Sequence, residues 1–312
     1  MSKTTRLARA RVALVTLASA LAGAPMAQAQ QNPVPTGATA VDDNAFKADA
    51  PGFYANADLS YVLTSGNSSS SSLGFKGDVT QRWGKHSVGF AAGGIRASSS
   101  PDTRIALGTP GAFEVLIPDA EPTAEAYYGR GRHDYKLSAR LFYTLGTGWE
   151  RNRFAGIENR WVVDSGIGCI LVNNARTSFR SAAGITYTNE NYTATELGRD
   201  GSFIGLRIGW DFRQKLLEST TFSHSFIFDQ SLEDSVARRF DAQFGVHVAM
   251  NARLGLKLNW RVLHNNRPPF TALPLFTPVG VLTGLSVLAP YKKTDQGVSV
   301  SLVLSVAPPK KN

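Results

Sequence analysis

The chain has 312 residues, a formal net charge of +9 and a single cysteine, Cys169. One cysteine excludes an internal disulfide, and therefore a small fold held together by disulfide bonds. The positive charge does not indicate a nucleic-acid partner, because Lys3, Arg6, Arg9 and Arg11 are concentrated at the N-terminus and no basic helix or aromatic platform follows them.

The first residues have the pattern of an export signal. A basic start is followed by the apolar run 12–21 and by the small-residue site Ala27-Gln28-Ala29, which predicts a cleavable signal peptide over residues 1–29. The apolar run is too short for a stable transmembrane helix. Residues 30–52 contain Pro, Ala and Asp without periodicity, and we interpret them as a flexible periplasmic lead-in.

The rest of the chain alternates apolar and polar residues in about twelve segments. In one of them Ile204, Leu206 and Ile208 alternate with polar or small residues such as Arg207. Successive side chains of a strand point to opposite faces, so this period of two suits a wall with lipid on one side and water on the other. We predict an all-β fold, a transmembrane antiparallel up-and-down β-barrel of about 12 strands over residues 53–306, with a C-terminal tail at 307–312.

The connections between these segments alternate in length. The short ones are 84–86, 133–136, 173–176, 213–219 and 251–253. The long ones are 65–72, 95–122, 146–159, 190–201, 229–238 and 264–295. Outer-membrane barrels have long extracellular loops and short periplasmic turns, so the alternation predicts the outer membrane of a Gram-negative bacterium with both termini in the periplasm. Membrane lipids and the outer-membrane assembly machinery are then the expected partners.

Three segments leave alternatives open. Neither face of 125–132 is cleanly apolar, and His224 falls on the lipid face unless a bulge turns it away. The apolar loop 268–290 folds inward as a plug, caps the barrel or meets a partner. It also has room for two further strands around 279–287, which would give fourteen.

Three stretches resemble a known bacterial family. They are 59–90, which contains the turn TSGN, 136–171, which contains RNRFAGIENR followed by GIG, and 181–190. Together they are similar to the domain-of-unknown-function family labelled as salt-induced outer membrane proteins. The resemblance implies an outer-membrane β-barrel without an assigned activity.

Residues suited to catalysis or metal binding are few. Of the five histidines, only His264 is expected at the outer rim, where Asp229 and Asp295 are near enough in the expected topology to form a hydrolase site. No histidine pair has the spacing of metal ligands, and Asp229, Glu233 and Asp234 lack the glycine of a calcium loop. We therefore expect no catalytic residue, metal or cofactor, and keep a hydrolase at the rim as the alternative.

The remaining candidate site is the barrel lumen. By strand parity the basic side chains expected to face inward are Lys76, Arg82, Lys136, Arg140, Arg160, Arg180, Arg207, Arg239, Lys257 and Arg261. The acidic ones are Asp78, Asp164, Glu190, Asp211 and Asp241. Two interpretations follow: an ion-paired network that fills a narrow barrel, or a small pore that favours anions because basic rings attract them.

The sequence thus favours a non-enzymatic outer-membrane barrel that contributes to envelope permeability or integrity. A small anion-biased pore is the finer form of this hypothesis. The alternatives are the rim hydrolase and a surface-binding protein that uses the long loops. The sequence identifies neither a solute nor a protein partner.

Overall fold

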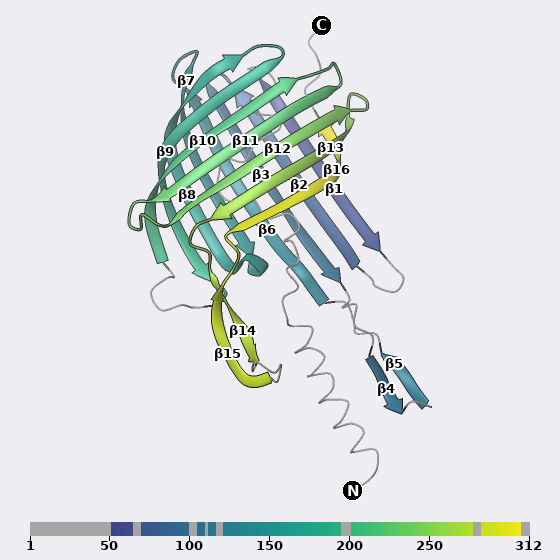
Figure 1. The fold of residues 1–312 in the computed structure, drawn as a ribbon. Coiled ribbons are helices and arrows are strands. Elements are labelled where there is room, and N and C mark those ends of the chain that lie inside the picture. The colour runs from purple at the N-terminus through teal and green to yellow at the C-terminus, as the bar shows by residue number, and fades with distance from the viewer. Residues whose placement is uncertain are drawn as a thin grey trace.

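A computed structural model describes residues 51–64, 70–99, 105–109, 112–116, 121–194, 201–276 and 282–306. Twelve of its strands close into one barrel, in the order β1-β16-β13-β12-β11-β10-β9-β8-β7-β6-β3-β2 (Figure 1). All neighbouring pairs are antiparallel, and strands consecutive along the wall are consecutive along the chain once the two small hairpins are set aside. The expected up-and-down barrel of twelve strands is confirmed.

The twelve wall strands have the following bounds: β1 Gly52–Thr64, β2 Ser70–Trp83, β3 His86–Ser99, β6 Glu121–Lys136, β7 Leu141–Asn152, β8 Ile157–Asn173, β9 Thr177–Tyr192, β10 Gly201–Lys215, β11 Thr220–Ser231, β12 Arg238–Ala249, β13 Leu254–Asn265 and β16 Thr294–Val306. The 3-10 helix η1 spans Arg153–Ala155. No helix in the described parts of the chain is long and apolar enough to span a membrane.

The first and last strands close the wall. β1 pairs with β16 from Ala55↔Val306 to Leu59↔Leu302, so the sheet has no free edge. β1 begins at Gly52, within the range that the sequence assigned to the lead-in. The expected signal peptide at 1–29, residues 30–50 of the lead-in and the tail at 307–312 lie outside the described residues.

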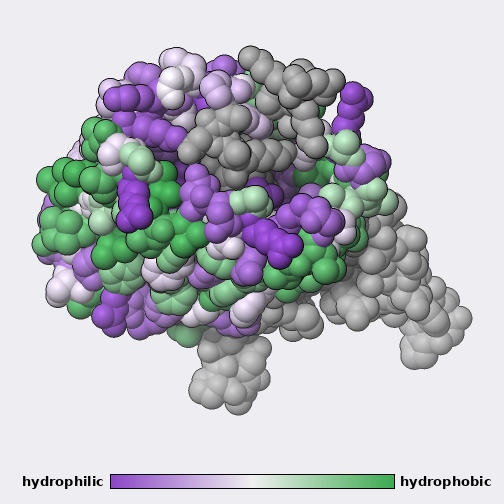
Figure 2. Space-filling model, turned by 90° about the horizontal axis from the view of Figure 1, so that it is seen from above, coloured by the Kyte–Doolittle hydropathy of each residue, from purple (hydrophilic) through white to green (hydrophobic). Residues whose placement is uncertain are grey.

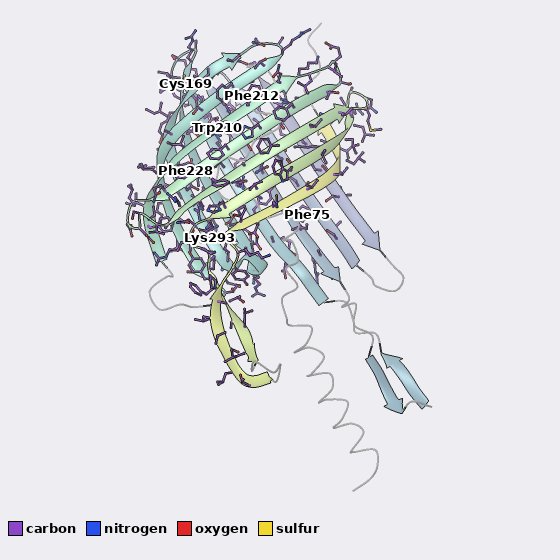
Figure 3. The ribbon with its side chains drawn as sticks, in the orientation of Figure 1. Phe75, Cys169, Trp210, Phe212, Phe228 and Lys293 are labelled. Carbon is purple, nitrogen blue, oxygen red and sulfur yellow. The ribbon has the colours of Figure 1, made fainter. Side chains whose placement is uncertain are left out.

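The two faces of the wall differ in polarity as the alternation predicts. Outward side chains such as Ile185, Leu206 and Leu256 are 46–58% exposed, whereas most of the buried polar residues point inward. Figure 2 shows hydrophobic residues along the outer wall together with hydrophilic residues of the rim. Figure 3 shows Trp210, Phe212 and Phe228 at different heights on this wall. A closed barrel with an apolar outer face and a polar lumen is an outer-membrane β-barrel.

Short turns gather at one end of the barrel and the longer connections at the other (Figure 1). One expected loop is wrong: 146–159 is not a long connection, since β7 continues to Asn152 and β8 begins at Ile157. Alternation persists through this stretch, with Trp149 and Arg151 on the opposite face from Glu150 and Asn152. The neighbouring short turn accordingly lies at 137–140 and not at 133–136.

The two small hairpins are separate from the barrel sheet. β4 (Ile105–Thr109) pairs with β5 (Ala112–Leu116), and β14 (Phe270–Phe276) pairs with β15 (Leu282–Pro290). Both project beyond the end that has the long connections (Figure 1). The apolar loop therefore does contain two strands. They form a separate hairpin, so the barrel has twelve strands, and the hairpin does not fold into the lumen.

The structure resolves both ambiguous wall segments. β6 is a strand whose inward residues Ala126 and Tyr128 pack with Ile95 of β3 in a small apolar cluster, so its inward face carries apolar as well as charged side chains. β11 pairs with both neighbours without a bulge, so His224 stays on the outer face. There its ring stacks on Phe244 with centroids 4.5 Å apart, and its Nδ1 accepts a hydrogen bond from Trp210 Nε1 at 3.3 Å.

Candidate functional site in the lumen and at the mouth

Opposite charges fill the described lumen. Among the described residues, the buried arginines are Arg82, Arg130, Arg160, Arg207, Arg239 and Arg261. The buried carboxylates are Asp78, Glu150, Asp164, Glu190, Asp211, Asp229 and Asp241. Six cations against seven anions make this buried set close to neutral, because arginine remains protonated in proteins.

Several ion pairs join strands that are not neighbours in the wall. Arg239 of β12 contacts Glu190 of β9 at 2.7 Å, although β10 and β11 lie between them. Arg207 of β10 contacts Asp164 of β8 at 3.0 Å, with β9 between them. Such pairs span one or two intervening strands on the inner side of the wall and are not ladder contacts between adjacent strands.

Arg160 and Glu190 form the centre of the network nearest the long connections. The Nε of Arg160 lies 2.6 Å from Glu190, and its Nη1 donates to Glu150. Glu190 also accepts from Arg239 at 2.7 Å and from the hydroxyl of Tyr192. Two guanidinium groups therefore share one buried carboxylate, and removal of that carboxylate affects both.

A second group of pairs lies toward the short turns. Arg180 bridges Asp211 at 3.3 Å and Asp134 at 3.4 Å, and Asp134 also binds Arg132 at 2.7 Å. The guanidinium carbons of Arg132 and Arg180 each lie 6.0 Å from the centroid of the Phe142 ring. At this distance an aromatic face still attracts a cation, so the ring adds to the charge pairs.

The residues expected in the lumen have the following positions. Arg160, Arg207, Asp211, Arg239, Asp241 and Arg261 are buried, with Arg261 Nε 2.8 Å from Asp241. Arg180 is 14% exposed, and Lys76 and Lys257 are partly exposed on the inward face of β2 and β13. Arg140 is different: β7 begins only at Leu141, so Arg140 lies in the exposed turn 137–140.

Sequence reasoning missed several inward charges. Glu150 and Asp229 are buried members of the network, and Asp134 and Arg132 are partly buried ones. The sequence placed Glu150 and Asp229 in loops. Their signal was present, since Trp149 and Phe228 point outward and the next residue of a strand must then point inward. The missed acids Glu150, Asp229 and Asp134 outnumber the missed cations Arg130 and Arg132 by one, and Arg140 lies outside the lumen, so the basic surplus on which the anion-biased pore depends is reduced.

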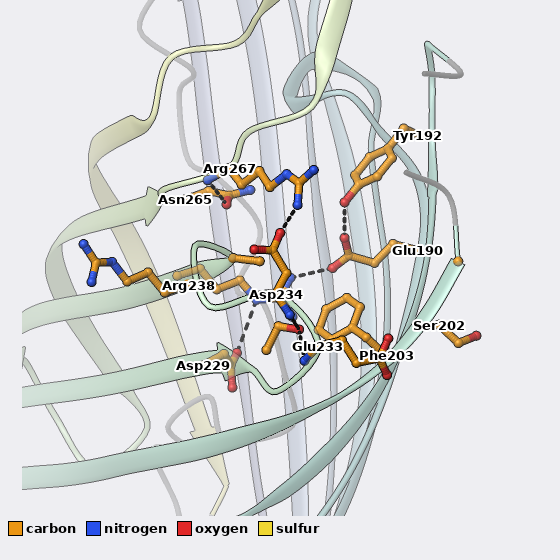
Figure 4. Close-up of a pocket in the computed structure, with 14 residues that line it drawn as sticks. Glu190, Tyr192, Ser202, Phe203, Asp229, Glu233, Asp234, Arg238, Asn265 and Arg267 are labelled. Carbon is orange, nitrogen blue, oxygen red and sulfur yellow. Dashed lines mark hydrogen bonds and ion pairs between the residues drawn. The ribbon is translucent and has the colours of Figure 1, made fainter. Parts of the chain in front are cut away.

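A cavity of about 220 Å³ opens at the end that has the long connections (Figure 4). Its polar lining includes Glu190, Tyr192, Asp229, Asp234 and Arg267. Most of these charges already have partners: Asp229 binds Arg207 and Arg239, and Asp234 binds Arg267. The cavity is thus a small polar vestibule above the network, and its charges stabilise the mouth.

The base of the β14–β15 loop covers part of this mouth. Asn266 donates from its backbone to Arg238 at 2.9 Å and from its side chain to Val236 at 3.0 Å. On the other side, Tyr291 and Pro269 pack against Gly156, where a Cβ would lie 2.7 and 2.8 Å from them. Gly156 follows β7 and Asn266 follows β13, so this base bridges distant parts of the rim. Of the three alternatives for the apolar loop, these contacts of its base agree with a cap over part of the barrel mouth.

The expected hydrolase residues do not assemble. His264 lies on the outer face, stacked on Phe240 with centroids 5.1 Å apart and hydrogen-bonded to Thr294 at 2.8 Å. Asp229 and Asp295 have the opposite parity and point into the lumen, so the wall separates them from His264. Within the described ranges no three His, Cys, Asp or Glu side chains form a metal cluster.

One histidine pair is visible only in the structure. His86 Nδ1 lies 3.0 Å from His133 Nε2 on the outer face near the short turns, although the two residues are 47 positions apart. Trp83 stacks on His86 with centroids 5.5 Å apart. Cross-strand pairing of β3 with β6 produces this contact, and sequence spacing gives no signal for it.

Comparison with known proteins supplies the family. The family described as "Protein of unknown function, DUF481" matches residues 57–274. The chain belongs to this family. Uncharacterized protein YdiY of Escherichia coli (strain K12) is 26% identical over 237 residues, which are 75% of this chain and 82% of YdiY. The resemblance to a family of unknown function is confirmed.

The solved structures that match this chain include the translocator domain of an autotransporter and a porin. The translocator domain of the autotransporter NalP from Neisseria meningitidis has a TM-score of 0.42 and 9% identity, and covers 84% of this chain and 90% of its own. An anion-selective porin from Comamonas acidovorans has a TM-score of 0.35 and 12% identity. The match covers 82% of this chain and 99% of the porin. At these scores the likeness says nothing about the function of this DUF481 protein.

Proposed function

We propose that this chain is a non-enzymatic outer-membrane protein that maintains the permeability barrier as a closed barrel. The observation that carries the proposal is the set of ion pairs across the lumen, above all Arg239–Glu190 and Arg207–Asp164. Charges that are buried and paired leave little room for mobile ions, and partial shielding from water strengthens each pair. The neutral balance of the buried set agrees with a filled lumen.

The proposal includes the route to the membrane. The leader 1–29 directs export, the assembly machinery inserts the barrel, and lipids cover its outer wall. The strongest support for the last step is the exposed apolar face, with side chains such as Leu256 at 47% and Val298 at 65% exposure.

Conductance in planar bilayers tests the closed barrel. The purified wild-type protein is expected to insert without steady channels. The double variant Glu190→Ala with Arg239→Ala removes one crossing pair without changing the net charge, and it is expected to conduct. The matched control is Lys215→Ala with Glu218→Ala, which removes an exposed pair at a short turn and leaves the lumen intact. Steady wild-type channels of porin size would overturn the proposal.

A small anion-biased pore is the second candidate. It is favoured by the lysines Lys76, Lys136 and Lys257, which point inward and add positive charge to the buried set. If the wild-type lumen conducts, this charge predicts a preference for anions, and the preference should weaken in high salt because the Debye length is about 10 Å at 0.1 M. Cation selectivity would exclude this candidate.

A further inference from the structure

The segment that carries the family resemblance, 151–160, has two faces. Asn152 and Arg160 are buried and point inward, where Arg160 joins the lumen network. Arg151, Arg153 and Glu158 are partly exposed, with 32%, 51% and 30% of their side-chain surface accessible. The proposed function as a closed barrel does not involve these three outward residues.

These three outward residues form one clamp. Glu158 accepts from Arg151 Nη2 at 2.7 Å, and from Arg153 Nε at 2.8 Å and Nη2 at 3.0 Å. The hydrogen bonds to Glu158 raise the pKa of Arg153 above its ordinary value. The pairing of β8 with β9 shifts register between Ile157 and Asn159, and such a bulge re-aims the side chain that it inserts. Here the inserted residue is Glu158.

The clamp has more positive charge and more donors than its single carboxylate uses. Two guanidinium groups share one glutamate, which leaves a net charge of +1 on an exposed surface. The Nε of Arg151 is buried and has no hydrogen-bond partner, whereas its Nη2 donates to Glu158. Arg96 of β3 is exposed on the outer face near the same end of the wall, opposite its cross-strand partner Glu125, so this second pair leaves the net charge of the surface at +1. This surface is therefore suited to an anion.

Two tryptophans define the level of the clamp relative to the membrane. Trp149 and Trp161 are cross-strand partners with ring centroids 6.4 Å apart, and Trp149 Nε1 donates to Asn159 at 3.2 Å. Such aromatic rings mark the height of the lipid headgroups. Arg151 follows Trp149 by two residues on the same face, so it lies about 7 Å further toward the long connections.

We infer that Arg151, Arg153 and Glu158 bind the phosphate of a glycolipid headgroup in the outer leaflet. The planar fork of arginine matches phosphate geometry, and charge-assisted bonds of this kind are among the strong ones. Glu158 holds the two guanidinium groups close together before the lipid binds, which lowers the conformational entropy lost by the arginine side chains on binding. The inference goes beyond the closed barrel and needs only that the long connections face outward.

Lipid retention in nanodiscs tests the site. Wild-type protein is mixed with lipid A that carries both phosphates, and the bound lipid is counted by native mass spectrometry. The variant Arg151→Gln with Arg153→Gln is expected to lose about tenfold in retention, equivalent to roughly 1.4 kcal/mol. Replacement of both arginines by lysine keeps the charge but not the fork, and is expected to give an intermediate loss. Unboiled gel migration verifies that each variant folds.

The control removes two exposed arginines from the short turns, Arg176→Gln with Arg253→Gln, and should retain lipid as the wild type does. Dephosphorylated lipid A should not be retained, and millimolar inorganic phosphate should not displace lipid A. Equal retention by the glutamine variant, or of the dephosphorylated lipid, overturns the site. Displacement by free phosphate shows that the clamp binds phosphate itself and overturns the lipid source. Conductance does not enter these measurements, so a failure here is distinct from a failure of the closed barrel.

Discussion

The Nη1 of Arg239 lies 2.7 Å from the Oε1 of Glu190, although two strands separate these residues around the wall. Glu190 also binds Arg160, so Glu190→Gln removes the negative charge from two buried ion pairs at once. Because breaking one side of a buried pair costs about 3–5 kcal/mol, we expect a clearly lower unfolding temperature. The measurement is the temperature at which unboiled protein loses its fast gel migration.

A double-mutant cycle makes this prediction specific. Glu190→Gln with Arg239→Gln should cost less than the two single changes added together, because each single change already removes the contact between these two residues. Glu218→Gln in an exposed turn is the control and should change stability by no more than about 0.5 kcal/mol. Additive effects of the two single changes would mean that the pair does not form in the membrane.

Gly156→Ala should loosen the cover of the mouth. Gly156 has φ +76°, which disfavours any side chain, and its Cβ would lie 2.7 Å from Tyr291 and 2.8 Å from Pro269. We expect faster chymotrypsin cleavage at the base of the β14–β15 loop on intact cells. Gly129→Ala is the matched control, because nothing lies within 4 Å of its added carbon. Equal cleavage rates in both variants would exclude the contact between Gly156 and this base.

The sequence predicts the wall better than the lumen. Period-two alternation identifies outward residues such as Leu206, because lipid tolerates almost nothing else there. It does not identify the pairing of Arg239 with Glu190, since contacts across the interior depend on barrel closure and not on local pattern. Errors in the predicted strand ends have the largest effect on the predicted lumen. The sequence pattern ends β7 before residue 146 and assigns Glu150 to a loop, whereas β7 continues to Asn152 and Glu150 is a buried acid of the network.

The orientation of the barrel gives a separate prediction. An epitope inserted at Gly108, within the β4–β5 hairpin, should be labelled on intact cells. One inserted at Glu218, in a short turn, should be labelled only after permeabilisation, because short turns face the periplasm. The reverse pattern would place the long connections in the periplasm and remove the basis for a glycolipid site at Arg151.

The lipid face gives the most direct test of the strand assignment. Leu206 and Leu256 are 46% and 47% exposed on the outer wall, whereas Ser301 of β16 points into the lumen. A cation near the bilayer midplane costs about 2–4 kcal/mol in a barrel, so Leu206→Arg and Leu256→Arg should each reduce the folded fraction in the outer membrane. Ser301→Arg should be milder, because its guanidinium enters a polar interior and not lipid, although it meets the like charge of Lys257, its cross-strand partner. The measurement is the fast-migrating fraction in membranes. If all three variants assembled equally well, the faces assigned to β10, β13 and β16 would be wrong.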